Sequence, residues 1–371
     1  MKNKKNERIE QYILIILFLF LLFLPLADQL FRIFPEVKLT ENRQLANISR
    51  MTEDGILKIP NKFETYYNDN FGLRTHLIRA NNILNVGLFS TSPNTAVVLG
   101  SEDWLYLTWG DESIFEYKKK LTEKELKSRF DVIKYRKELL AGQGIQFFVV
   151  IAPNKHSIYP EFLPEYLQKL NKNSKYDQIT EYLGKNSLDI NIDVKNGLMK
   201  EKQKGNLVYF KSNTHWNDYG NFIAYQQIIA KLGAYYPELK PMPLNDFNFV
   251  NIENAGDLAK MLGMEEYFKE KTYALIPKNN RIAIIREVDN IDGIASKGLM
   301  LSECNLCGNL TIVIVGDSFM ELLRPLIAEH FSKVVYIQKA ENPEVTFNII
   351  KKIKPEILLY EIVERDMNII Y

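Results

Sequence analysis

Apolar and polar positions along this chain predict helices and buried strands that follow one another. Residues 121–144 have apolar positions at helical spacing, with Thr122 and Glu125 placed as a capping box. Residues 146–152 follow directly, and their unbroken Phe-Phe-Val-Val-Ile run is typical of a strand buried on both faces. The same alternation predicts strand 311–315, helix 319–331, strand 334–337, helix 343–353 and strand 357–363. This order predicts an α/β sandwich with a mostly parallel central sheet.

The N-terminal segment has a different pattern, basic and then apolar. Lysines 2, 4 and 5 and Arg8 precede the uncharged, Leu-, Ile- and Phe-rich run 12–27. A run of about 16 residues is longer than the apolar core of most signal peptides and shorter than a full membrane span. No clear small-residue cleavage site follows, which favours an uncleaved anchor over a cleaved signal, and the flanking lysines place the N-terminus in the cytoplasm. We therefore expect a single-pass cell-membrane protein whose main domain is extracytoplasmic, in the periplasm or at the cell surface.

These patterns divide the chain into three expected segments. Residues 1–34 form a cytoplasmic tip and transmembrane helix, and residues 35–95 form an export-side linker followed by one or two helices within 63–88. Residues 96–371 form the main domain, which opens with strand-like residues 97–107 around a turn.

Charge and cysteine content exclude several function classes. Lys+Arg 47 against Asp+Glu 46 gives a formal net charge of +1, so we expect no nucleic-acid partner. Cys304 and Cys307 form a single C-x-x-C, and a zinc site needs four ligands, so no metal is expected. The pair is interpreted as a short-loop disulfide or as two free thiols.

A Gly-Asp-Ser turn is the first candidate for chemistry. Apolar strand 311–315 stops at Gly316, Asp317 and Ser318, and a helical pattern begins. This position places Ser318 at the carboxyl end of a strand, where open α/β sheets hold their sites, and beside free N–H groups that can bind an oxyanion. The alternative is that Asp317 or Ser318 only caps the helix, because both residue types are preferred caps.

A histidine segment upstream supplies the base that such a serine needs. His215 lies at a loop-to-helix junction, two residues after Asn213 and before the helical pattern 222–229. A serine hydroxyl is a poor nucleophile until a histidine, oriented by a third group, takes its proton. Among the four histidines of the chain, this placement favours His215; taken alone, it would be interpreted as a packed or surface loop residue.

The two segments together resemble a known family. Gly316-Asp317-Ser318-Phe319, preceded in the chain by Asn213-Thr214-His215-Trp216, is similar to the SGNH-like domain of the alginate O-acetyltransferase AlgJ/AlgX family. Further short stretches resemble segments of this family in the same order along the chain. They are residues 41–46, 71–74, 100 with 103–106, 153–155 with 159–160, 256–258 and 361–365. The resemblance implies an SGNH-like three-layer α/β/α sandwich behind an N-terminal transmembrane helix, with Ser318 as nucleophile and His215 as base. The implied activity transfers acetyl from an acetyl-serine to hydroxyls of an exported polysaccharide.

One position departs from the family pattern. The family has Asp where this chain has Asn213, and a carboxylate normally stabilises the imidazolium. Asn213 can still accept a hydrogen bond from the ring. Alternatively Asp218 or Asp257 reaches His215 in space, or turnover has been lost and the chain is a non-catalytic polysaccharide assembly subunit.

The donor and the acceptor are defined only by the resemblance. No nucleotide or coenzyme-A motif is visible and no cofactor is expected, so the resemblance implies a membrane-bound O-acyltransferase partner that supplies acetyl. The partner on the acceptor side is a polysaccharide, and a carbohydrate acetyl esterase remains an alternative activity. Contributors to acceptor binding could be Lys155, Tyr159, Arg324 and Arg365, although each residue type is more often structural or solvated.

Overall fold

The computed structural model describes residues 4–35, 45–47, 58–108, 120–168, 173–338 and 343–369. The chain forms two compact units. One contains Met1–Thr95 and Ala259–Tyr267, and the other contains Ala96–Leu258 and Phe268–Tyr371. The expected linker 35–60 lies largely outside the described residues.

The first unit is helical. Its helix α1 (Lys4–Phe31) includes a 24-residue stretch, Arg8–Phe31, that is long and apolar enough to cross a membrane. Two further helices, α2 (Ile59–Asn70) and α3 (Arg74–Gly87), fall where one or two helices were expected. On α3, Asn82 donates a hydrogen bond of 2.6 Å to the carbonyl of Leu262, which ties the segment 259–267 to this unit.

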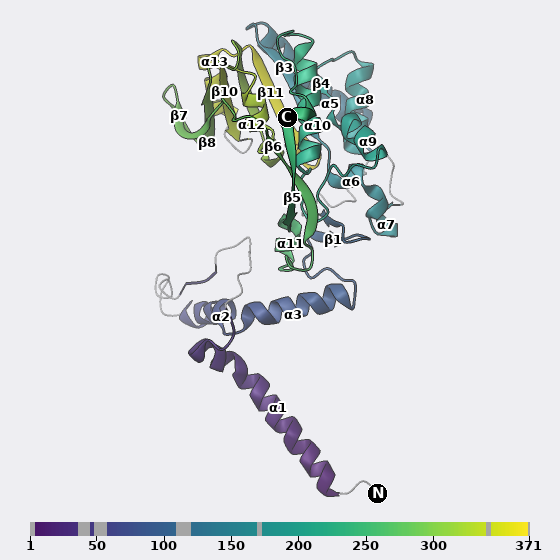
Figure 1. Ribbon diagram of the computed structural model, residues 1–371, viewed down its shortest axis with the longest axis vertical. Helices are drawn as coiled ribbons and strands as arrows, with labels where there is room; N and C mark the ends of the chain where they lie inside the picture. The colour runs from purple at the N-terminus through teal and green to yellow at the C-terminus, as the bar shows by residue number, and fades with distance from the viewer. Residues whose placement is uncertain are drawn as a thin grey trace. The chain divides into compact units, whose positions relative to one another are not determined.

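A seven-stranded sheet organises the second unit (Figure 1). The strand order is β4-β3-β11-β9-β10-β8-β7, and the first five strands are parallel. Strand β8 is antiparallel to β10, and β7 is antiparallel to β8. The prediction of a mostly parallel sheet is therefore confirmed. The strands are β3 (Gln146–Ala152), β4 (Asn191–Ile192), β7 (Ile285–Ile291), β8 (Ile294–Glu303), β9 (Thr311–Gly316), β10 (Lys333–Gln338) and β11 (Ile357–Val363).

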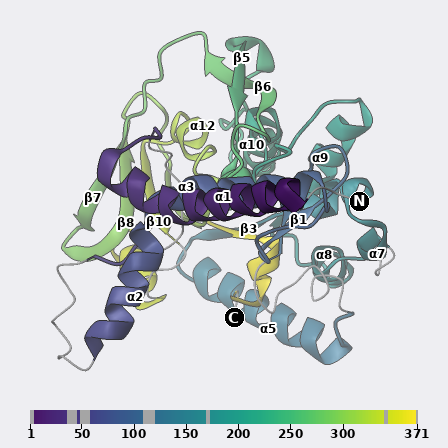
Figure 2. The same cartoon turned by 90° about the horizontal axis from the view of Figure 1, so that it is seen from below.

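Both faces of this sheet are buried, because successive side chains of a strand point to opposite faces. In β3, Phe148 and Val150 enter one core, whereas Phe147, Val149 and Ile151 enter the other. Helices cover each face, and Figure 2 shows α10 and α12 on the opposite side of the sheet from α5 and α8. The three-layer α/β/α arrangement is confirmed. One layer consists of α9 (Val194–Gln203), α10 (Asp218–Gly233) and α12 (Arg324–Ala328), and the other of α5 (Glu123–Ala141), α8 (Lys175–Lys185) and α13 (Pro343–Ile353).

Smaller elements complete the unit. The expected strand pair around a turn is present as β1 (Val97–Leu99) and β2 (Leu105–Leu107). An antiparallel ribbon of β5 (Phe247–Asn254) and β6 (Glu270–Pro277) was not predicted (Figure 1). The remaining short α-helices of this unit are α6 (Lys155–Ile158) and α7 (Glu165–Gln168). Helix α11 (Asp257–Met261) begins in this unit and ends in the segment 259–267 of the first unit.

Local rules account for two helix boundaries. The side chain of Thr122 and that of Glu125 form the expected capping box at the start of α5. The predicted continuous helix 319–331 is wrong, since a single 3-10 turn (Ser318–Met320) is followed only by the five-residue α12. Pro325 lies in the first turn of α12. Proline has no backbone N–H, so it cannot donate the hydrogen bond that a continuous helix needs at this position.

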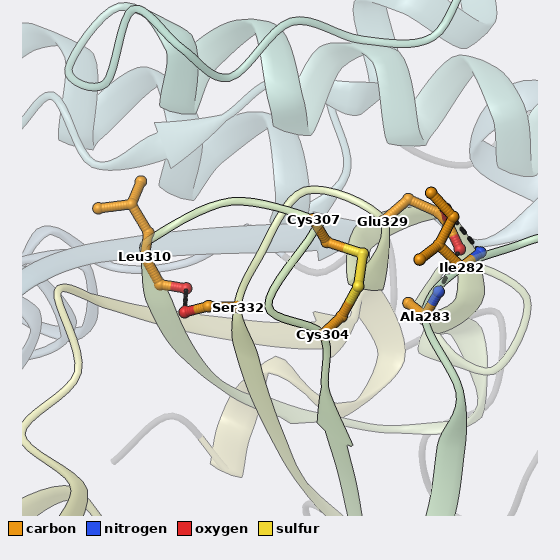
Figure 3. Close-up of a disulfide and its surroundings, with 7 residues drawn as sticks. All are labelled: Ile282, Ala283, Cys304, Cys307, Leu310, Glu329 and Ser332. Atoms are coloured by element: carbon orange, nitrogen blue, oxygen red, sulfur yellow. Dashed lines mark hydrogen bonds between the residues drawn. A yellow bond between two sulfur atoms is a disulfide. The ribbon is translucent and has the colours of Figure 1, made fainter.

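The two cysteines form a disulfide in the loop between β8 and β9 (Figure 3). The N–H of Cys304 donates to the carbonyl of Ser332 at 2.8 Å, and Ser332 Oγ donates to the carbonyl of Leu310. This loop precedes β9, so it lies at the opposite end of that strand from Ser318. Of the two states expected from the sequence, the paired one is observed.

Candidate active site

The candidate residues gather at the carboxyl ends of three neighbouring parallel strands. Ser318 follows β9, Asn154 follows β3, and Arg365 follows β11, which lies between the other two. Parallel strands bring these ends to one edge of the sheet, which is where open α/β folds place their sites. Ser318 is exposed at that edge, as a nucleophile must be.

Ser318 and His215 are in hydrogen-bonding contact although 103 residues separate them. Ser318 Oγ lies 2.8 Å from His215 Nε2, and His215 Nδ1 lies 2.8 Å from Asn213 Oδ1. The same Oδ1 accepts the backbone N–H of His215 at 3.0 Å, so the amide oxygen of Asn213 faces the ring. An oxygen at that position selects the tautomer with hydrogen on Nδ1, which leaves Nε2 free to accept the serine proton.

A carboxylate also reaches the histidine. Asp257 Oδ2 lies 3.7 Å from His215 Nδ1, and the carboxylate accepts the backbone N–H of Thr214 at 2.7 Å as well as its hydroxyl. Of the two acids that could reach His215, Asp218 and Asp257, Asp257 is therefore the one that lies beside it. The other acid, Asp218, accepts the backbone N–H of Leu275 at 3.0 Å, and no interaction with His215 is found for it in the described part of the chain.

Gly256 allows Asp257 to approach so closely. A Cβ at this position would lie 2.4 Å from the Cβ of Asn213 and 2.4 Å from the carbonyl oxygen of Ser212. Any other residue would therefore push the two segments apart.

The surroundings favour the neutral form of His215. Burial lowers its pKa, the nearby carboxylate of Asp257 acts in the opposite direction, and the Arg365 guanidinium lowers the pKa again. A neutral imidazole is the form that can accept a proton from a serine hydroxyl.

The loop that carries His215 is held by a buried lysine, Lys155, the first residue of α6. Lys155 Nζ lies 3.1 Å, 2.7 Å and 2.7 Å from the carbonyl oxygens of Phe210, Lys211 and Asn213 respectively. Three acceptors match the three N–H donors of an ammonium group. Burial lowers the pKa of Lys155 to about 7, and this residue is 4% exposed, so the suggestion that it contacts an acceptor is wrong.

A second distant group, Glu270 at the start of β6, holds the same loop. Its carboxylate accepts the backbone N–H groups of Lys211 and Ser212 at 2.7 Å and 2.9 Å and the Ser212 hydroxyl at 2.6 Å. No local sequence pattern marks Glu270, because it lies in a strand of mixed polar and apolar residues, 58 positions beyond Ser212.

The turn that carries Ser318 is held by its own strand neighbours. Asp317 accepts the N–H of Phe319 at 2.9 Å and the N–H of Val363 at 2.8 Å, so it caps the turn as one alternative proposed. The hydroxyl of Tyr336 donates to the carbonyls of Gly316 and Asp317, both at 2.9 Å. Asp317 is thus structural, which leaves the Ser318 hydroxyl free to contact His215.

Two other residues suggested for acceptor binding have structural contacts instead. Tyr159 is 3% exposed, and its hydroxyl accepts the backbone N–H of Val208 at 3.0 Å. The Arg324 guanidinium lies 4.5 Å from the ring centroid of Tyr336 and bonds to the sulfur of Met300.

Arg365 does lie at the site. Its guanidinium is 5.7 Å from the ring centroid of Phe319 and donates to Asn154 Oδ1 at 3.3 Å. Burial is the main cause that lowers the pKa of His215, and the charge of Arg365 acts in the same direction.

Comparisons with known proteins identify the family and the fold. Residues 97–325 match the family model described as "SGNH hydrolase-like domain, acetyltransferase AlgX". A protein of Pseudomonas syringae pv. tomato named "Probable alginate O-acetylase AlgJ" is 27% identical over 287 residues, which cover 75% of this chain and 68% of the relative. The protein of the same name from Pseudomonas fluorescens is 26% identical over 242 residues, 63% of this chain and 58% of that relative.

The solved structure of Bacillus cereus PatB1 with a sulfonyl adduct has the same fold, with a TM-score of 0.55, 17% identity and coverage of 73% of this chain and 97% of PatB1. The chain belongs to the AlgJ/AlgX-like family of SGNH hydrolase-like acetyltransferase domains.

Proposed function

We propose that this chain is a polysaccharide O-acetyltransferase that works through an acetyl-serine intermediate on the outer side of the cell membrane. The observation that carries the proposal is the 2.8 Å contact between the Ser318 hydroxyl and His215 Nε2 at an open strand end. Family membership supports acetyl transfer, and the two relatives named as alginate O-acetylases support a polysaccharide acceptor.

In the first step, Ser318 Oγ attacks the carbonyl carbon of an acetyl donor while His215 Nε2 takes its proton. The bond from the acetyl carbon to the donor breaks, and His215 returns the proton to the departing group. Asn213 keeps the ring in the reactive tautomer, and the Asp257 carboxylate stabilises the imidazolium that forms. The backbone N–H of Ser318 is a candidate oxyanion donor, because no hydrogen bond within the described residues occupies it.

In the second step, a sugar hydroxyl replaces the serine. His215 takes the proton of this hydroxyl, the hydroxyl oxygen attacks the acetyl carbon, and the proton passes to Ser318 as its ester bond breaks. Transfer rather than hydrolysis requires that the sugar reaches the acetyl group before water does.

The N-terminal helix supports a location at the membrane. Helix α1 is long and apolar enough for one span, and the basic residues before it favour a cytoplasmic N-terminus. An extracytoplasmic enzyme has no access to cytosolic acetyl thioesters, so a membrane-bound O-acyltransferase would deliver the acetyl group.

Transfer can be tested with the purified chain, an aryl acetate as donor and an exported polysaccharide as acceptor. We expect acetyl esters on the polysaccharide with wild-type protein and none with Ser318→Ala. A serine-directed ester probe should label wild-type protein but not Ser318→Ala. Release of free acetate at one rate, with or without the polysaccharide, would identify an esterase, and no turnover by folded wild-type protein would favour an assembly subunit.

A further inference from the structure

A cavity of ≈980 Å³ opens beside the nucleophile on the face of the sheet covered by α5 and α13. Ser318 and Asp317 line one end of it. His215 does not line it, and the ring of His215 packs instead against Phe319, whose side chain belongs to the core of the opposite face. The cavity and the histidine therefore approach Ser318 from different sides.

The two helices each present one continuous side to this cavity. On α5 the lining positions are the apolar Val132, Tyr135, Leu139 and Leu140 together with the charged Arg136, all at helical spacing. On α13, Phe347 and Ile350 line the cavity at helical spacing as well. Tyr135 is 64% exposed, Leu139 is 44% exposed and Phe347 is 51% exposed, so a row of large apolar side chains at the rim is in contact with solvent. Exposed apolar side chains that gather around a cavity are typical of a ligand site.

The cavity has an apolar end and a polar end. Phe147 and Leu358 are the second residues of β3 and β11, and both line the floor. Polar residues gather at the other ends of the strands, with Gln338 as the last residue of β10 and Asp317 and Asp366 just beyond β9 and β11. Arg136, Thr346 and Tyr360 add polar groups to the lining between these ends. Because strand residues rise about 3.3 Å each, the cavity extends along the strands over roughly 15 Å, from an apolar interior to the serine.

We propose that this cavity is an acyl-chain site, and that Ser318 accepts straight-chain acyl groups of about four to eight carbons as well as acetyl. An acetyl group has a single methyl beyond its carbonyl and would leave nearly all of the cavity empty. An ester whose carbonyl lies at Ser318 can extend its hydrocarbon chain between α5 and α13 towards Phe147 and Leu358. The proposal rests on the proposed role of Ser318 and deepens it by naming a second class of acyl donor.

The bonds formed and broken with a longer acyl ester are the same as those with an acetyl ester. A bond forms between Ser318 Oγ and the acyl carbon, and the ester bond to the leaving alcohol breaks. The serine proton passes through His215 Nε2 to the leaving oxygen. Water or a sugar hydroxyl then takes the acyl group and returns a proton to Ser318 by the same route.

The test uses the full chain and the p-nitrophenyl esters of acetate, butyrate and hexanoate at concentrations below micelle formation. Burial of one methylene corresponds to about fourfold in binding, so we expect kcat/KM to rise at least tenfold from acetate to butyrate and to rise again for hexanoate. Mass spectrometry of the trapped intermediate should find both acyl groups on Ser318.

Two matched variants on α5 test whether the hydrocarbon chain of the ester lies in the cavity. Leu139→Trp fills the rim of the cavity and should bring the hexanoate-to-acetate ratio of kcat/KM close to one. Lys134→Trp adds the same side chain at an exposed position of α5 that does not line the cavity, and it should keep the wild-type ratio. The acyl-chain site is overturned if kcat/KM does not rise from acetate to the longer esters. It is also overturned if the hexanoate-to-acetate ratio is the same in Leu139→Trp and Lys134→Trp. Either result leaves the acetyl-serine proposal intact. Absence of acetyl on Ser318 overturns the proposed function itself.

Discussion

The turn that carries Ser318 and the loop that carries His215 are built in different ways. Residues 316–318 are held by the neighbouring strands, through Tyr336 and the N–H of Val363. Residues 210–215 are held by the side chains of Lys155, Asp257 and Glu270, which come from three separate places in the chain. The N–H of Asp317 also donates to Glu361 of β11, so the contacts of the nucleophile turn come from the strands beside it. The difference teaches that the nucleophile depends on the sheet, whereas the position of the base depends on a few side chains from distant segments.

Among the residues that hold these two segments in place, the largest effect is expected from Lys155→Met, which keeps the side-chain bulk but removes all three bonds to the histidine loop. Buried carbonyls left without partners cost about 1–3 kcal/mol each, so the free energy of unfolding should fall by roughly 3 kcal/mol or more in urea titrations. Because a misplacement of about 1 Å can cost 100-fold, kcat/KM for an aryl acetate should fall by about that factor in the folded variant.

The matched change in the nucleophile turn is Tyr336→Phe, which removes the hydroxyl bonds to Gly316 and Asp317. It should cost about 1 kcal/mol of stability and only a few-fold in kcat/KM, because the sheet still positions Ser318. Equal losses in the two variants would mean that the base and the nucleophile are positioned with the same dependence on single side chains.

Asp257→Asn tests whether this carboxylate supports the base. The variant keeps an oxygen for the N–H of Thr214 but removes the charge near His215, and we expect kcat/KM to fall by about tenfold. Activity requires neutral His215, so it rises with pH through the pKa of this histidine. Since Asp257 acts to raise that pKa, its removal should move the acid limb of the kcat/KM profile to lower pH. An unchanged pH profile would contradict the assignment.

Asn213→Asp adds a second carboxylate beside His215 Nδ1. The acid limb should move to higher pH, and kcat/KM on its plateau should gain about tenfold at most, because the amide oxygen already selects the tautomer. In Ser-His-Asp proteases the reverse exchange costs about 10⁴. A gain of that size in steady-state assays would show that Asp257 does not replace the missing acid.

The smallest effect is expected from Arg365→Gln. The guanidinium acts to lower the pKa of His215, so without it the acid limb should move to higher pH with little change in the plateau. A shift to lower pH in the kcat/KM profile would mean that Arg365 acts on a different group.

Local patterns predicted the parts of the fold that depend on local rules. Strand 146–152, helix 343–353 and strand 357–363 have the predicted bounds. A continuous apolar run marks a strand buried on both faces, and an apolar repeat at helical spacing marks an amphipathic helix. The β5–β6 ribbon was missed, since it is mostly exposed and lacks a strong alternation, and the interruption at Pro325 was overlooked.

The candidate site was only partly predictable from the sequence. Ser318 follows a strand and His215 precedes a helix, so a local pattern marked each of them, and the structure brings them into contact. Glu270 and the buried role of Lys155 carry no such mark, because their partners are backbone groups far away in the chain. Contacts of this kind depend on the tertiary fold alone.

The most direct test of the account is to find where an acetyl group is held during turnover. Protein quenched during reaction with an aryl acetate would be digested, and the acetylated peptide identified by mass spectrometry. The account predicts acetyl on Ser318 in wild-type protein, none on that peptide in Ser318→Ala, and acetylation slowed by 100-fold or more in His215→Ala. Acetyl on another residue, with undiminished turnover in Ser318→Ala, would contradict it.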